Sequence, residues 1–393
     1  ERAIMKFYNN DKLPNIKAQK VCIFVGSHSK FTMELQNAID EFCEKYNAIV
    51  LCDQTSNYKG KYRILGGLVA AQSDYDAACK YADLYIHIGE ISGSYYLFKK
   101  GIFWRVNEDG EIRDPFRLLE SVFEMNELDF FNYYNSLVSK KKNTYFDEWK
   151  MENKKIESMI EELPLSNAWM CQQTAHRLPQ NSVLHLAILN SLRSWNLFDT
   201  PNSVYSYSNV GGFGIDGCIS SCVGASLVNK QKLYFCVSGD LATFYDLNVL
   251  GNRHIGNNFR LLVSNNGTGF EMHCKGSIGS EFDYAEADRF FCAGGHFGSQ
   301  SRLLLRHFAE DLGFDYIKAE TKEEYLNNIE YFVDPNLHEK PLIFEVFVNP
   351  KDDEFAYNAT KRTITSNKAV AKKVAKKVLG NKGYNSIKKM IKG

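Results

Sequence analysis

The stretch "VSGDLATFYDLNVLGNRHIGNNFRLLVSNNG" (residues 237–267) decides the fold of the second half of the chain. Two apolar runs end within it, one at Gly239 and the other at Asn265, and a helical pattern lies between them. Continuous apolar runs separated by a helix are typical of parallel strands that are covered on both faces. Asp240 and Asn265 are therefore expected at the carboxyl edge of a parallel sheet, where α/β proteins bind their ligands.

Oxygen donors at this edge predict a site for magnesium and a diphosphate. Asp240 offers a carboxylate, Asn265 an amide oxygen and Gly267 a turn carbonyl, and Mg²⁺ prefers such ligands together with phosphate oxygens. The backbone N–H groups of Leu241 and Ala242 open the intervening helix, an arrangement that favours phosphate. The alternative is that Asp240 only caps a helix and Asn-Asn-Gly is a plain turn. The occurrence of both motifs on strand ends favours the site.

The rest of the chain follows the same α/β pattern twice. Residues 21–140 contain the expected strands "KVCIFVG", "AIVLCD", "ADLYIHIGEISG" and "GIFWRVNEDG", with the helix "FTMELQNAIDEFCEKY" after the first. Residues 166–355 contain the expected helices "SNAWMCQQTAHRL", "NSVLHLAILNSLRSW" and "GCISSCVGASLV" and the strands "SVYSYS", "KLYFCVSGD", "FRLLVSNNG", "FDYIKAE" and "PLIFEVFV". This pattern predicts two doubly wound, Rossmann-like domains with parallel sheets. The first lacks a G-x-G-x-x-G motif, which argues against a nucleotide site there.

The segments outside these domains are expected to be peripheral. Residues 1–20 are interpreted as a linker remnant and residues 141–165 as a solvated linker helix, because that stretch is highly charged and ends in proline. The remaining residues, 356–393, are expected to form a basic C-terminal tail.

The overall charge balance hides an asymmetry. The chain carries 47 basic and 47 acidic residues, but residues 361–393 hold 11 Lys or Arg and no acid. The body is therefore acidic, which argues against nucleic-acid binding. The tail segment "NKAVAKKVAKKVLG" predicts a basic amphipathic helix, interpreted as a solvated or docking segment, with contact to an anionic membrane as the alternative.

Cysteine usage and hydropathy predict a soluble, cytoplasmic protein. The ten cysteines form no Cys-x-x-Cys pair, and Cys218 and Cys222 lie four apart in an expected helix, so buried reduced thiols are expected rather than disulfides or zinc ligands. No apolar run reaches the roughly 18 residues that a membrane helix needs, and no secretory signal opens the chain.

Gly-Asp followed some 25 residues later by Asn-Asn-Gly resembles the signature of the thiamin-diphosphate-dependent enzymes. The segments "SNVGGFGIDGCISSCVGAS" (residues 208–226) and "GDLATFYDLNVL" resemble in particular the 2-succinyl-5-enolpyruvyl-6-hydroxy-3-cyclohexene-1-carboxylate synthases of menaquinone biosynthesis. The similarity runs from about residue 20 to residue 349. It implies thiamin diphosphate and Mg²⁺ as cofactors, with Asp240, Asn265 and Gly267 as metal ligands. The implied cofactor contacts are Gly214, Ile215, Gly239, Asp240, Leu241, Ala242, Asn265 and Gly267, with Ile215 supporting the thiazolium ring.

Three positions depart from the pattern of these synthases. Val210 and Leu186 stand where the synthases carry arginines, and Phe213 replaces a serine. Losing two arginines removes two partners for substrate carboxylates. The departures predict a retained cofactor site and a rebuilt substrate pocket.

The resemblance further implies decarboxylation of a 2-oxoacid with carbon–carbon bond transfer, in a homodimer or homotetramer. In this family the activating glutamate comes from a pyrimidine-binding domain, and no segment of this chain matches that domain. The chain also begins with Glu1 rather than Met. We therefore expect an excised fragment that has no turnover alone, and no catalytic glutamate is assigned.

Several other residues are candidates for the substrate pocket. The segment after Asn-Asn-Gly makes Phe270, Glu271 and His273 candidate pocket residues, although a single histidine is more often a packed or surface residue. His254 and His296 lie near the two motifs in sequence, with a helix entry as the simpler interpretation of the region around His296. The alternative function is a non-catalytic, degenerate family member that acts as a binding or assembly module.

Overall fold

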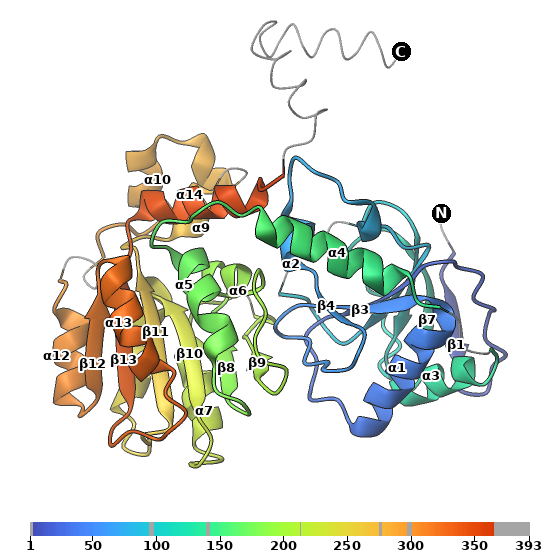
Figure 1. Ribbon diagram of the computed structural model, residues 1–393, viewed down its shortest axis with the longest axis horizontal. Coiled ribbons are helices and arrows are strands. Elements are labelled where there is room, and N and C mark those ends of the chain that lie inside the picture. The colour runs from blue at the N-terminus through green and yellow to red at the C-terminus, as the bar shows by residue number, and fades with distance from the viewer. Residues whose placement is uncertain are drawn as a thin grey trace, which may run out of the picture.

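The computed structural model describes residues 3–93, 98–138, 142–212, 214–274, 277–296 and 301–364. These residues form two α/β domains that lie side by side, each built on one sheet (Figure 1). Every strand pairing is parallel, which confirms the predicted fold class. The predicted tail helix lies outside the described residues.

The central domain contains a seven-stranded sheet in the order β1-β7-β6-β5-β2-β3-β4. Its strands are β1 (Met5–Tyr8), β2 (Val21–Val25), β3 (Ala48–Cys52), β4 (Arg63–Leu65), β5 (Leu84–Ile88), β6 (Ile102–Val106) and β7 (Leu119–Glu124). Its helices are α1 (Met33–Tyr46), α2 (Gly67–Ala71), η1 (Ala78–Lys80) and α3 (Glu127–Asn135), with α4 (Tyr145–Ser158) packed on the sheet. All residues of β2, β3 and β5 are buried, because apolar clusters cover both faces of the sheet.

The second domain contains a six-stranded sheet in the order β12-β13-β11-β10-β8-β9. Its strands are β8 (Val183–Leu186), β9 (Tyr205–Tyr207), β10 (Tyr234–Gly239), β11 (Phe259–Asn265), β12 (Asp315–Ala319) and β13 (Leu342–Phe347). Its helices are α5 (Asn167–Thr174), η2 (Ala175–Arg177), α6 (Asn190–Trp195), α7 (Cys218–Ser226), α8 (Asp240–Tyr245), η3 (Leu247–Gly251), α9 (Phe270–His273), η4 (Ile278–Glu281), α10 (Tyr284–Phe290), α12 (Leu304–Asp311), α13 (Lys322–Phe332) and α14 (Pro350–Lys361).

The structure corrects four of the predicted segments. Residues 5–8 form β1, which pairs with β7, so the prediction of a linker is wrong for them. Residues 183–186 form a strand instead of the start of a helix, because Val183, Leu184 and Leu186 are buried beside β10. Helix α4 is not wholly solvated, since Tyr145 and Trp149 are buried against the central sheet. Helix α14 also continues past the predicted end of the second domain at residue 355.

The two domains are joined by specific polar contacts. The turn after β3 reaches the second domain, where Gln54 Nε2 donates to the Phe198 carbonyl (3.0 Å) and Asn57 Oδ1 accepts from Ser206 N (3.0 Å). Helix α14 crosses from the second domain toward α2, and Gln72 Nε2 donates to the carbonyl of Thr360 (2.7 Å) (Figure 1). These contacts fix the junction between the domains.

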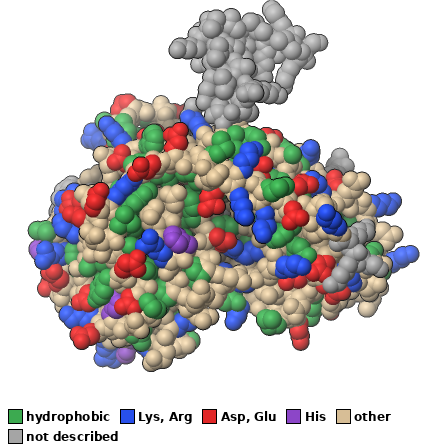
Figure 2. Space-filling model, viewed as in Figure 1, with side chains coloured by type: hydrophobic (Ala, Val, Ile, Leu, Met, Phe, Trp, Pro, Cys, Tyr) green, Lys and Arg blue, Asp and Glu red, His purple; other side chains and the backbone are tan. Residues whose placement is uncertain are grey.

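The ten cysteines are all buried and free, as the sequence predicted, with Cys218 and Cys222 on α7. No helix among the described residues is long and apolar enough to cross a membrane. On the face shown in Figure 2, acidic and basic side chains are interspersed over both domains.

Candidate functional site

The predicted site lies at the topological switch point of the second sheet. Strand β10 lies between β8 and β11. After β8 the chain continues to β9 at one edge of the sheet, and after β10 it continues to β11 in the opposite direction along the sheet. The carboxyl ends of these strands carry residues 187–190 and Gly239–Asp240. The switch point is where open α/β sheets bind their ligands. The topology therefore brings the first half of the predicted site to the expected place.

Asp240 is buried at the start of α8, where it is 2% exposed. Its Oδ2 atom lies 2.6 Å from Nε2 of His296, a residue that comes from the loop after α10. Leu241 and Ala242 lie in the first turn of α8, whose N–H groups have no partner within the helix. Thr243 Oγ1 donates to the Gly239 carbonyl (2.8 Å) and fixes the start of this turn.

Asn265 ends β11, next to β10, and its amide is held in one orientation. Its Nδ2 donates to Oε1 of Glu345 on β13 (2.7 Å), and Tyr316 Oη donates to the other carboxylate oxygen of Glu345 (2.7 Å). With the amide nitrogen engaged in this way, Asn265 Oδ1 accepts no hydrogen bond from any described residue. Glu345 thus orients the amide so that its oxygen is available to a ligand.

The turn after Asn265 is fixed from α14. Gly267 has a φ of 73°, the left-handed region that favours glycine, so this turn requires glycine at that position. Asn266 Nδ2 donates to Asp353 Oδ2 (2.9 Å), and Asn266 Oδ1 accepts from Thr268 N (3.2 Å). Asp353 also accepts a hydrogen bond from Asn167 N (2.7 Å), so it ties the turn to α5.

Asp240 has two further buried carboxyl groups near it, those of Asp353 and Glu345, and it repels both. Burial raises the pKa of Asp353 to about 6 and raises the pKa of Glu345 above its ordinary value, and the charge of Asp240 adds to both shifts. A divalent cation placed between Asp240 and Asn265 would offset this negative potential. The donor set of carboxylate, amide oxygen and turn carbonyl fits the hard-oxygen preference of Mg²⁺.

No group of three or more His, Cys, Asp or Glu side chains suited to a metal ion occurs in the part of the chain that the structure describes. The predicted ligand set is of a different kind, because Asp240 is its one carboxylate. Asn265 and Gly267 would contribute an amide oxygen and a backbone carbonyl.

Ile215 and Gly214 come close to the same edge. Ile215 packs on a small apolar cluster formed by Ala187, Cys218 and Ala242, which joins the ends of β8 and β10 to the start of α7. The sequence segment that resembles the thiamin-dependent enzymes therefore lies beside the predicted diphosphate site. The predicted cofactor residues from the two segments are brought together.

The three candidate pocket residues have different surroundings. Phe270 is buried with its ring against Tyr357 (5.6 Å between centroids), and His273 stacks on Tyr284 (4.1 Å). His273 is thus a packed side chain in this structure. Glu271 forms an ion pair with Arg193, and burial raises the pKa of Glu271 despite the nearby Arg193.

The structure also places the other residues considered from the sequence. His254 is exposed, and it lies before β11, away from the carboxyl edge. Val210 and Leu186 are 5% and 2% exposed and belong to the apolar core of the second domain. Phe213 lies outside the described residues. The sequence patterns do not identify the positioning residues Glu345 and Asp353. Glu345 lies within an ordinary apolar strand and Asp353 in the first turn of an ordinary helix, and neither belongs to a motif.

Comparison with known proteins confirms the resemblance. The chain is 32% identical over 251 residues to the 2-succinyl-5-enolpyruvyl-6-hydroxy-3-cyclohexene-1-carboxylate synthase of Bacteroides fragilis, covering 64% of this chain and 43% of that protein. It is 24% identical over 348 residues to the synthase of the same name from Flavobacterium psychrophilum, covering 85% of this chain and 60% of that protein. The chain is therefore similar to these synthases. It spans 43% and 60% of the length of the two relatives, less than two thirds of each.

The fold comparison agrees with this relationship. The thiamine diphosphate-dependent 4-hydroxybenzoylformate decarboxylase of Rhodococcus jostii RHA1 superposes with a TM-score of 0.58 at 15% identity, covering 84% of this chain and 62% of that chain. At this identity the match concerns the fold alone. No family model matches the chain.

Proposed function

We propose that this chain provides the central and diphosphate-binding domains of a thiamin-diphosphate-dependent enzyme that decarboxylates a 2-oxoacid and transfers the remaining carbon unit. The observation that carries the proposal is the placement of Asp240, Asn265 and Gly267 at the carboxyl ends of the neighbouring strands β10 and β11, beside the switch point of the second sheet. The relationship to the synthases supports the same assignment.

Each residue at the edge has a defined role in this proposal. Asp240, the Oδ1 atom of Asn265 and the carbonyl of Gly267 would hold Mg²⁺, and the first N–H groups of α8 would face the diphosphate. Glu345 keeps the Asn265 amide in the orientation that the metal requires. Bound thiamin diphosphate supplies the carbon nucleophile and the electron sink for the decarboxylation.

The substrate pocket is proposed to differ from that of the menaquinone-pathway synthases. Val210 and Leu186 are packed in the core at the two positions where the synthases carry arginines. A buried valine and leucine offer no hydrogen bond to a carboxylate. We therefore propose a substrate with fewer or differently placed acidic groups.

The complete enzyme is proposed to need a pyrimidine-binding domain and to act as a homodimer or homotetramer. The activating glutamate would come from that domain. The chain supplied with thiamin diphosphate and Mg²⁺ is therefore expected to release no carbon dioxide from 2-oxoacids, and turnover by the chain alone would contradict this division of labour.

A degenerate, non-catalytic family member is the second candidate function, because the substitutions at Val210 and Leu186 also fit a loss of activity. The two candidates differ in what they predict for the cofactor edge. A binding module has no need of an oriented Asn265 amide, so the intact contact between Asn265 and Glu345 favours the enzyme.

Equilibrium dialysis of the chain with thiamin diphosphate tests the proposed function. Binding is expected to require Mg²⁺, to be lost with a chelator and to be competed by inorganic pyrophosphate, because the proposed contacts are to the metal and the diphosphate. Binding that is indifferent to both the metal and pyrophosphate would contradict the proposed site.

A further inference from the structure

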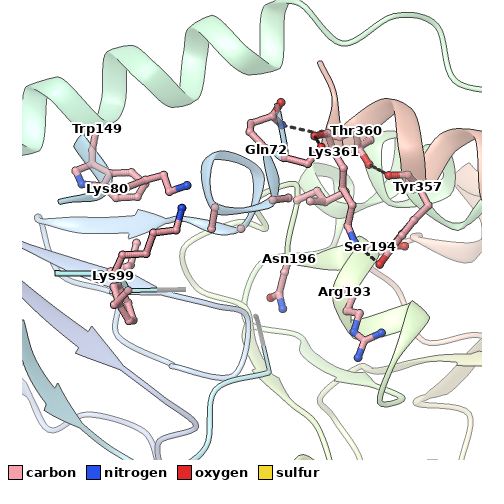
Figure 3. A pocket seen from close by; sticks show the side chains of 18 residues that line it. Gln72, Lys80, Lys99, Trp149, Arg193, Ser194, Asn196, Tyr357, Thr360 and Lys361 are labelled. Atoms are coloured by element: carbon pink, nitrogen blue, oxygen red, sulfur yellow. Dashed lines mark hydrogen bonds between the residues drawn. The ribbon is translucent and has the colours of Figure 1, made fainter. Parts of the chain in front are cut away.

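A cavity of about 370 Å³ lies at the junction of the two domains. None of the residues assigned to the diphosphate or the metal belongs to its lining. The volume lies at the lower end of the range of small-molecule pockets, about 300–1,000 Å³. Figure 3 shows the cavity between the helix that carries Trp149 and the end of α14.

The walls of the cavity are held in place by both domains. Gln72 and Ser73 of the central domain hydrogen-bond the carbonyls of Thr360 and Lys361 at the end of α14 (Gln72 Nε2 to Thr360 O, 2.7 Å; Ser73 N to Lys361 O, 2.8 Å). The cavity is therefore a preformed feature of the domain junction, which lowers the cost of ordering a bound ligand.

The lining is basic and contains no acidic residue. Four of the eighteen lining residues are basic, namely Lys80, Lys99, Arg193 and Lys361, and none is Asp or Glu. Lys80 and Lys99 extend into the cavity from the central domain, while Arg193 and Lys361 come from the second domain (Figure 3). Basic residues of both domains thus line the cavity.

Acidic side chains behind the walls offset only part of this charge. Lys80 pairs with Asp76 (3.1 Å), and Arg193 pairs with Glu271. Lys361 contacts the hydroxyl of Tyr357 and also interacts with the charge of Glu271, so one carboxylate serves both Arg193 and Lys361. Burial lowers the pKa of Lys361. An anion in the cavity would form charge-assisted hydrogen bonds with these cations, and these bonds would replace the hydration that the cations lost on burial.

The rest of the lining is largely apolar. Leu51, Ala70, Trp149 and Leu197 form much of the wall between the two pairs of basic residues. Inorganic anions gain nothing from such a surface, whereas a flat or aliphatic body buries apolar area against it. The lining therefore favours an organic ligand over a free inorganic ion.

We propose that this cavity binds a small organic dianion, with acidic groups at both ends of an apolar body, at a site separate from the cofactor. One acidic group would face Lys80 and Lys99, and the other would face Arg193 and Lys361. The proposal concerns this cavity alone and does not depend on the proposed function.

Calorimetric titration with naphthalene-1,5-disulfonate tests the proposal, because this probe carries two anionic groups on a flat apolar body. The titration is made on the Asp240→Ala variant, so that the proposed diphosphate site does not contribute. One probe is expected to bind per chain, and the Lys80→Gln/Lys361→Gln variant is expected to bind at least about tenfold more weakly.

The matched control is the Lys100→Gln/Lys351→Gln variant, which removes two exposed lysines outside the lining and changes the net charge equally. It is expected to bind like the parent. Equal weakening in both double variants, or no saturable binding by the parent, would overturn the proposal. Displacement of the probe by sodium sulfate at the same concentration would also overturn it, since that result describes a site for any anion. Thermal unfolding confirms that each variant is folded.

Discussion

Each sheet of this protein has a buried aspartate directly after one of its interior strands, but the two aspartates have different surroundings. Asp53 follows β3 in the central domain, and its carboxylate accepts from Thr55 N (2.7 Å), Thr55 Oγ1 (2.6 Å), Ser92 Oγ (2.7 Å) and Gly93 N (2.7 Å). Asp240 follows β10, and it meets the ring of His296 instead. The first carboxylate is saturated by its own turn and by the loop after β5, and the second keeps capacity for a ligand.

The two sheets also differ in how closely the loops at their switch points approach each other. The switch point of the central sheet lies between β2 and β5. In the central sheet the loops after β2 and β5 bond directly to each other, through Gly26 N to Ile88 O (3.0 Å) and Ser27 N to Ile91 O (3.0 Å). A Cβ atom on Gly26 would lie 1.9 Å from the Glu90 carbonyl oxygen, so the loops are in close contact. The crevice that binds ligands in other doubly wound folds is filled here.

This comparison teaches that the position of an aspartate in an α/β fold does not define its role. The saturated edge of the central sheet shapes the turn that carries Gln54 and Asn57 into the second domain. The less saturated edge of the second sheet lies beside the residues that resemble a cofactor site. Function follows from which polar groups remain available.

The largest expected effect is on stability, from Asp53→Ala. The substitution removes the shared acceptor of the hydrogen bonds from Thr55, Ser92 and Gly93, so we expect a loss of about 3–5 kcal/mol in the free energy of unfolding. Urea unfolding measures it. Asp240→Ala serves as the control and is expected to cost less than about 1 kcal/mol. Equal losses would break the comparison.

The next effect concerns the pH dependence of stability through Asp353. The folded state raises the pKa of this carboxyl from its ordinary value of 3.8 to about 6, so the folded state binds its proton more tightly than the unfolded state. The stability from this group is therefore fully present below about pH 4 and is lost as the pH rises through about 6. The loss is on the order of 3 kcal/mol. Unfolding curves of Asp353→Asn are expected to lack this fall between pH 4 and 6, and an unchanged pH profile would contradict the assignment.

A smaller effect is expected where the saturated edge docks on the second domain. Asn57 has a φ of 58° and accepts from Ser206 N, so Asn57→Ala removes the contact and adds backbone strain, for about 2 kcal/mol in total. Asn57→Gly removes the same contact without the strain and is expected to cost less. Chemical unfolding of both variants separates the two terms. An Asn57→Gly loss as large as that of Asn57→Ala would contradict the role of strain.

The smallest expected effect sharpens the account of the second edge. Glu345→Gln keeps the size of the side chain but replaces the carboxylate with an amide. The glutamine can accept from the Asn265 amide nitrogen or donate to the Asn265 amide oxygen, so the Asn265 amide is no longer held in one orientation. We expect Mg²⁺-dependent binding of thiamin diphosphate to weaken about tenfold. Glu330→Gln, on the exposed surface of α13, is the control and should bind like the parent. Unchanged binding by Glu345→Gln would show that the orientation of the amide has no part in the site.

Much of this organisation could be predicted from the sequence because it rests on local patterns. Continuous apolar runs indicated β2, β3, β10 and β11, and the residues directly after β10 and β11 indicated the proposed cofactor edge. The sequence predicts a helix where β8 lies, because the apolar run "VLHLAIL" fits a helix and a buried strand equally well. Only the pairing with β10 decides for the strand.

The supporting residues of the site could not be found in this way. Glu345 reaches Asn265 from 80 residues away, and Asp353 reaches Asn266 from 87 residues away. His296 lies 56 residues from Asp240. Such contacts depend on the strand order and on the path of α14, which no local pattern in the sequence specifies. The basic cavity was missed for the same reason, since its lysines and arginine come from both domains.

The central proposal is that Asp240 helps to hold a metal and a diphosphate, while Asp53 only stabilises the loops after β3 and β5. The most direct test is a calorimetric titration of thiamin diphosphate with Mg²⁺ into the parent chain and into the Asp240→Ala and Asp53→Asn variants, each checked for folding by circular dichroism. The account predicts binding by the parent and by Asp53→Asn, and at least a hundredfold weaker binding by Asp240→Ala, about 2.7 kcal/mol. Equal affinity for the parent and Asp240→Ala would contradict it.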